Sequence, residues 1–103
     1  MADRSDQLLA AYFAMNELVK ARRCYNQNRE LAASCAKCAQ GLLTMANNAP
    51  ALSGLQPIIN GDTITREDAM KMLHRAFSRT RAAINRLEAA THEQPEATAT
   101  RTR

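Results

Sequence analysis

The first forty residues of this 103-residue chain contain neither glycine nor proline. Their apolar side chains recur at intervals of three and four residues, the spacing that places side chains on one face of an α-helix. The first row comprises Leu8, Tyr12, Met15 and Val19. This pattern predicts a helix over residues 6–25, with Ser5 capping its first amides and Asp6 near the positive end of its dipole.

A second apolar row follows at the same spacing and predicts a helix over residues 29–48. It comprises Leu31, Cys35, Cys38, Leu42 and Met45. If the first helix simply continued, its apolar row would extend to positions 22, 26, 29 and 33, which lie roughly opposite the face that carries residues 31, 35 and 38. The sequence "NQN" at 26–28 stands between the rows, and Asn tends to cap or end helices. We therefore expect two helices joined by a tight turn; one continuous helix is the alternative.

The segment 50–64 is both broken and apolar. Its prolines and glycines exclude a helix through Pro57 and Gly61. It also carries Leu52, Leu55, Ile58 and Ile59. We expect a loop that covers the end of the core, and the alternative is an exposed patch offered to a partner.

The last helix is expected over residues 65–91. Thr65 is its N-cap candidate, and Asp68 stands at the reciprocal capping position. Its apolar row comprises Met70, Leu73, Phe77, Ile84 and Leu87, and beside it runs an alanine column of Ala69, Ala76, Ala83 and Ala90. Such a column lets a neighbouring helix approach closely. Residues 92–103 hold no large apolar side chain, so we expect a disordered tail.

These elements predict an all-α fold: a small antiparallel bundle of about three helices, forming a single domain over residues 1–91. Apolar residues make up 46% of the chain, but many are alanine, and only four residues are aromatic. The core must therefore be thin and closely packed. Long helices with few bulky side chains also suggest a homodimer, in which a second subunit would cover apolar surface.

Three cysteines raise the question of a metal or redox site. Cys35 and Cys38 form a CxxC pair, but they lie in an alanine-rich helical context rather than in the turn that a zinc site uses. No strand precedes them, as a thioredoxin-like pair requires. We therefore predict that both thiols act as small apolar side chains facing a neighbouring helix, and we expect neither a metal nor a cofactor.

The remaining side chains do not indicate an enzyme. The chain lacks a glycine-rich phosphate loop and the common hydrolase motifs. Glu17 is the only acid in the interior of the first expected helix, and Glu30, Glu67 and Asp68 stand where helix starts explain them. His74 lies beside an apolar row, where a lone histidine is more often a boundary residue than a base. We predict no catalytic residues.

Charge supplies the remaining functional candidates, since 14 Lys and Arg exceed 10 Asp and Glu. Four cations of the last helix fall within about 80° of one another, on the side away from its apolar row. They are Lys71, Arg75, Arg79 and Arg86, and a second cluster holds Lys20, Arg22 and Arg23. These clusters are either solvated faces or a docking surface, because clustered Arg pairs well with carboxylate and phosphate.

By elimination, we expect a non-enzymatic protein-binding module, an adaptor or small inhibitor that docks onto a larger protein with an acidic or mixed surface. Accessory proteins of phages or other mobile elements fit this size. The alternative is a nucleic-acid-binding accessory protein that contacts phosphates through the arginine face of the last helix. The longest apolar run is too short to cross a membrane and no secretory signal is evident, so we expect a cytoplasmic location with no membrane partner.

Overall fold

The computed structural model describes the backbone of residues 4–46 and 54–101, and the side chains of those residues up to Ala89. Within this part of the chain there are four helices and no strand. The helices are α1 (Arg4–Cys24), α2 (Arg29–Met45), α3 (Gln56–Asn60) and α4 (Arg66–Arg101). The predictions of an all-α class and of a small helical bundle are thus confirmed.

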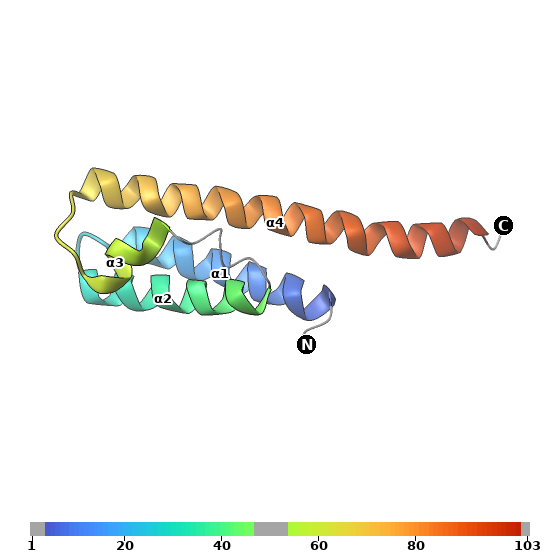
Figure 1. The fold of residues 1–103 in the computed structure, drawn as a ribbon, viewed down its shortest axis with the longest axis horizontal. Coiled ribbons are helices and arrows are strands. Elements are labelled where there is room, and N and C mark those ends of the chain that lie inside the picture. The colour runs from blue at the N-terminus through green and yellow to red at the C-terminus, as the bar shows by residue number, and fades with distance from the viewer. Residues whose placement is uncertain (1–3, 47–53, 102–103) are drawn as a thin grey trace.

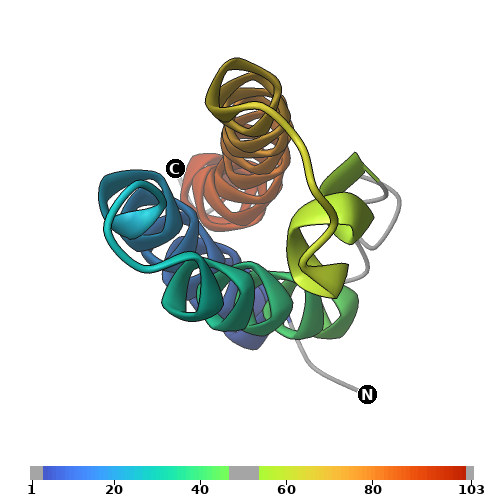
Figure 2. The same cartoon turned by 90° about the vertical axis from the view of Figure 1, so that its left-hand side faces the viewer.

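The three long helices lie side by side along one axis of an elongated molecule that measures 59 × 24 × 20 Å. α1 runs antiparallel to both α2 and α4 and packs against each of them, whereas α3 packs against α2 (Figure 1). Seen from the end, α1 stands between α2 and α4, and α3 closes the side opposite α1 (Figure 2). The core lies inside this ring of four helices.

The turn between the first two helices confirms the two-helix prediction. α1 ends at Cys24, whose carbonyl accepts hydrogen bonds from the amides of Gln27 and Asn28. Asn28 is extended (φ −152°, ψ 92°), and its side-chain oxygen accepts a hydrogen bond from the amide of Leu31 at 3.0 Å. An asparagine N-cap therefore starts α2.

The two other expected caps have different outcomes. Thr65 caps α4, since its hydroxyl oxygen accepts a hydrogen bond from the amide of Asp68 at 3.1 Å. The cap expected at Ser5 is wrong, because α1 begins at Arg4 and Ser5 already lies inside the helix. Asp6 does occupy the first turn, where the helix dipole favours a negative charge.

The apolar connector covers the core, but it does so with a short helix that the sequence analysis did not expect. Pro57 lies in the first turn of α3, where its missing amide hydrogen costs nothing. Gly61 ends α3 in the left-handed conformation (φ 74°) that glycine adopts without strain. Leu55 and Ile58 are buried, so the core-cover interpretation is confirmed for them. Leu52 lies outside the described residues.

The backbone of α4 is helical as far as Arg101, so the helix extends past residue 91, where the sequence analysis expected it to end, into the segment 92–103 that was expected to be a disordered tail. Six of the ten residues 92–101 are Ala, Glu, Gln or Arg, which rank high in helix propensity, although Pro95 and two threonines in the same stretch rank low. Low hydrophobicity removes a reason for the segment to pack, but it does not remove its propensity to be helical.

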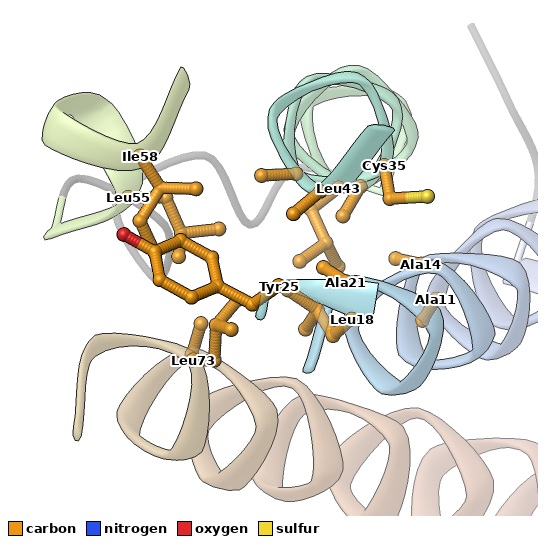
Figure 3. Close-up of a cluster of buried hydrophobic side chains, with 14 of the residues drawn as sticks. Ala11, Ala14, Leu18, Ala21, Tyr25, Cys35, Leu43, Leu55, Ile58 and Leu73 are labelled. Carbon is orange, nitrogen blue, oxygen red and sulfur yellow. The ribbon is translucent and has the colours of Figure 1, made fainter. Parts of the chain in front are cut away.

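The core consists largely of alanine. The buried alanines of α1 and α2 are Ala10, Ala11, Ala14, Ala21, Ala32, Ala36 and Ala39, and Ala46 is buried directly after α2. The alanine column of α4 is buried at Ala69, Ala76 and Ala83. Few bulky side chains join them, and several meet around Tyr25, where Leu18, Leu43, Leu55, Ile58 and Leu73 come from all four helical segments (Figure 3). Small side chains allow helix axes to approach closely, so a thin core is still densely packed.

Several of the large apolar side chains that the sequence analysis placed on inner faces are exposed to solvent. Leu31 is 48% exposed, Met45 60% and Tyr12 41%, and Phe13 and Leu9 are also exposed. On α2 the buried face is turned by about one residue from the predicted row. The helices pack through their smallest side chains, and the neighbouring row of larger ones is left at the edge.

Candidate binding surfaces

The predicted basic residues are all exposed, but they do not form one surface. Lys71, Arg75, Arg79 and Arg86 lie on the outer side of α4, and Lys20, Arg22 and Arg23 lie on α1. Arg75 and Arg79 line a hollow of about 230 Å³ with Gly54 and Met72. The α1 cations line two other grooves, so the two clusters remain separate sets of partner-binding candidates.

The first groove lies between α1 and α2, and we call it the α1/α2 groove. Its volume is about 570 Å³. It is lined by Leu31, Ser34 and all three cysteines, with Glu17, Lys20 and Arg23 contributed by α1. Its surface is mainly apolar because the row that begins with Leu31, Cys35 and Cys38, which was predicted to face the core, runs along this edge of α2.

Helical periodicity extends the apolar surface beyond the groove. Phe13 precedes Glu17 by one turn and so lies on the same side of α1. Leu42 and Met45 follow Cys38 by one and two turns on the same side of α2. Phe13 is 51% exposed and Met45 60%, so large apolar side chains meet water along this edge.

The cysteines differ in exposure although they share a groove. Cys35 is buried, Cys24 is half-buried and Cys38 is exposed, and all three are free thiols. The prediction that both members of the CxxC pair face a neighbouring helix is correct for Cys35 and wrong for Cys38. Burial, reinforced by the nearby Glu17 carboxylate, raises the pKa of the Cys35 thiol. Within the described residues no three His, Cys, Asp or Glu side chains are grouped to hold a metal ion.

We expect thiol-reactive reagents to label Cys38 first and Cys35 last, with rates about tenfold or more apart at neutral pH. The thiolate is the reactive form, so the raised pKa of Cys35 slows its labelling further, and its labelling rate should keep rising with pH until the pH reaches that raised pKa. Timed alkylation followed by peptide mapping measures the order. Equal rates for Cys35 and Cys38 in the folded protein would contradict this placement.

The charged edge of the α1/α2 groove is partly neutralised. The Lys20 ammonium lies 2.9 Å from a Glu17 carboxylate oxygen, one turn away on α1. The hydrogen bond to Glu17 raises the pKa of Lys20, and the Glu17 charge adds to the rise. Because the Lys20 side chain is 63% exposed, this pair contributes little to stability, and its role is to place polar groups at the groove's edge.

The second groove lies where the C-terminal end of α1 meets the N-terminal end of α4, and we call it the α1/α4 groove. Its volume is about 480 Å³. Its charged and titratable lining is Arg22, Arg23, Arg66 and His74. Arg23 therefore lines both grooves. The structure brings Arg66 and His74 to the predicted Arg22–Arg23 pair, a combination that sequence spacing could not show.

A polar contact fixes α1 to α4 farther along the bundle. The Tyr12 hydroxyl donates a hydrogen bond to Oε2 of Glu88, 76 residues away in sequence. This hydrogen bond, with smaller contributions from desolvation and from the negative charge of Glu88, raises the pKa of Tyr12. The Tyr12 ring, predicted to point inward, thus lies at the surface with its hydroxyl paired.

Comparison with protein-family models, with curated proteins and with solved structures gives no match for this chain. Its function must therefore be argued from its own surfaces. In the part of the chain that the structure describes, no helix has the length and apolar character needed to cross a membrane.

The sequence contained a signal for the α1/α2 groove that the row of large residues concealed. Two apolar rows run side by side on α2, one of them Leu31, Cys35, Cys38, Leu42 and Met45, the other Ala32, Ala36, Ala39, Leu43 and Ala46. Two adjacent apolar rows make an apolar surface that is too wide for one neighbouring helix to cover. Counting both rows would have predicted an uncovered edge.

Proposed function

We propose that this chain is a non-enzymatic protein-binding module whose α1/α2 groove receives an amphipathic helix of a larger protein. The proposal rests on where the apolar residues lie. Alanine fills most of the core, while the larger side chains of Phe13, Leu31 and Met45 are about half exposed or more. Exposed apolar side chains gathered along one edge are characteristic of interaction surfaces. Burying them in the complex would supply the driving force.

The shape and charge of the groove favour a helix as its occupant. Two antiparallel helices form a trough, and a third helix can lay its apolar side chains along such a trough at intervals of three and four residues. At the edge, Lys20 and Arg23 provide positive charge that is only partly neutralised by Glu17. An acidic flank on the incoming helix would set its orientation and its association rate.

A variant that replaces Phe13 and Leu31 by serine should lose the partner. Both side chains are about half exposed, so far-UV circular dichroism should remain unchanged. Truncation of anchor residues typically costs about 2 kcal/mol or more each, so retention of the partner should fall by at least about thirtyfold. The measurement is a pull-down with the tagged chain from its source cell's lysate, with and without nuclease, followed by mass spectrometry.

The matched control replaces Arg75 and Arg79 by glutamine, on the outer side of α4. We expect this control to retain the partner and the partner to slow labelling of Cys38, which lines the groove. Equal retention by the wild type and the Phe13/Leu31 variant would exclude this groove. Loss of all bound material after nuclease, or loss only in the Arg75/Arg79 variant, would instead favour phosphate binding by α4. A second copy of the chain as the sole occupant would replace the partner by a homodimer.

A further inference from the structure

The α1/α4 groove carries more positive charge than the fold requires. Arg22 and Arg23 come from the last turn of α1, where the negative end of the helix dipole favours cations. Arg66 is the first residue of α4, where the positive end of the dipole disfavours a cation. An acid at position 66 would serve the stability of α4 better, so a guanidinium there needs another explanation.

The charges in this groove are not compensated within the described residues. Arg22, Arg23 and Arg66 form no ion pair with a carboxylate in this part of the chain. The two acids of the first turn of α4, Glu67 and Asp68, do not line the groove. Three guanidinium groups from two helices therefore face one space without an anion between them.

The walls of the groove are apolar. Val19 comes from α1, and Met70, Leu73 and Phe77 come from α4. Leu73 belongs to the core, and Met70 and Phe77 are half-buried beside it. A ligand that fills this space must therefore present apolar groups to the walls and anions to the guanidinium groups.

We propose that the α1/α4 groove binds an acidic, partly apolar peptide segment of a partner protein, in which leucine-like side chains lie on the walls and carboxylates pair with Arg22, Arg23 and Arg66. Guanidinium groups bind carboxylates through two parallel hydrogen bonds, which gives both strength and orientation. This site shares Arg23 with the α1/α2 groove, but the proposal does not depend on the function proposed for that groove.

A nucleic acid fits these walls less well than a peptide does. A phosphate backbone would use the three guanidinium groups but would leave the apolar walls uncovered. Base stacking needs exposed aromatic rings, and Phe77, the aromatic residue lining the groove, is half-buried against the core. The apolar lining thus favours a peptide.

The test titrates the full chain into a fluorescently labelled peptide of alternating glutamate and leucine pairs, with fluorescence anisotropy as the readout. A peptide with every glutamate replaced by glutamine, and another with every leucine replaced by serine, are the ligand controls. We expect each control peptide to bind at least about tenfold more weakly, since charge-assisted hydrogen bonds and apolar contacts each contribute.

The protein variants compare two pairs of exposed arginines. R22Q with R66Q removes two guanidinium groups from the groove, and R75Q with R79Q removes the same charge from the outer side of α4. We expect the first pair to weaken binding of the glutamate–leucine peptide about a hundredfold, and the second by less than about threefold. Circular dichroism confirms that both variants are folded.

Three results would overturn the proposal. Equal loss in both double variants would show that only net charge matters. Equal binding of the glutamate and glutamine peptides would show that the carboxylates are not recognised. Tighter binding of a single-stranded oligonucleotide than of the glutamate–leucine peptide, lost in R22Q/R66Q, would assign the groove to phosphates instead.

Discussion

Replacing Tyr25 by alanine should lower the free energy of unfolding by about 3–5 kcal/mol, the typical cost of deleting a buried aromatic ring. The Tyr25 ring is only 3% exposed and lies among side chains of the α3 segment, α2 and α4 (Figure 3). The Arg29 guanidinium carbon stands 5.0 Å from the ring centroid and covers its outer face. In a core made largely of alanine, few side chains are long enough to fill the space that the ring leaves.

The measurement is urea unfolding followed by circular dichroism at 222 nm. A domain of this size has a total stability of about 5–15 kcal/mol, so the Tyr25→Ala variant should lose a large share of it and unfold at a clearly lower urea concentration than the wild type. Tyr25→Phe is the control, because it keeps the ring and its contact with Arg29; we expect it to stay within about 1 kcal/mol of the wild type. A loss in Tyr25→Phe as large as in Tyr25→Ala would show that the hydroxyl group, and not the ring, is the stabilising part.

Replacing Ala14 by leucine should lower the free energy of unfolding by about 1–3 kcal/mol or more, although it adds apolar surface. Ala14 is fully buried on the packed face of α1, in the alanine-rich part of the core (Figure 3). Three additional carbon atoms at that point must push α1 away from its neighbour. The same separation would loosen every alanine contact along the helix pair.

Ala82→Leu is the matched control, because Ala82 is exposed on α4 and the change in composition is identical. We expect its unfolding free energy to stay within about 0.5 kcal/mol of the wild type. If Ala14→Leu unfolds at the wild-type urea concentration, the helices are not held as close as an alanine core implies. Increased stability would mean that α1 and its neighbour can separate at no cost.

Local signals in the sequence predicted the backbone well. Asn28 and Thr65 marked helix starts because their side chains can bond to backbone amides a few residues ahead, a short-range property that needs no tertiary structure. Pro57 was misread, since the same residue that blocks a helix interior is tolerated in a first turn. Whether Pro57 falls in a first turn or in a helix interior depends on where α3 begins, and that start is set by the packing of Leu55 and Ile58 in the core.

The direction of each helix face was harder to predict. The row of Leu31, Cys38 and Met45 is a true helical row, but it lies beside the packed one. Hydrophobicity ranks leucine and methionine above alanine, whereas helix packing in this bundle depends on how closely two axes can approach. The α1/α4 groove lay beyond sequence reasoning for another reason: Arg22 and Arg66 are 44 positions apart, and only the antiparallel arrangement of α1 and α4 brings them together.

Arg23 lines both grooves, and this shared position has a thermodynamic consequence. One guanidinium group can direct its donors toward only one anion at full strength. A ligand in the α1/α2 groove that engages Arg23 would lower the affinity of the α1/α4 groove for its own ligand, and the second ligand would weaken the first by the same factor. The two grooves are therefore expected to show negative coupling, without any change in the arrangement of the helices.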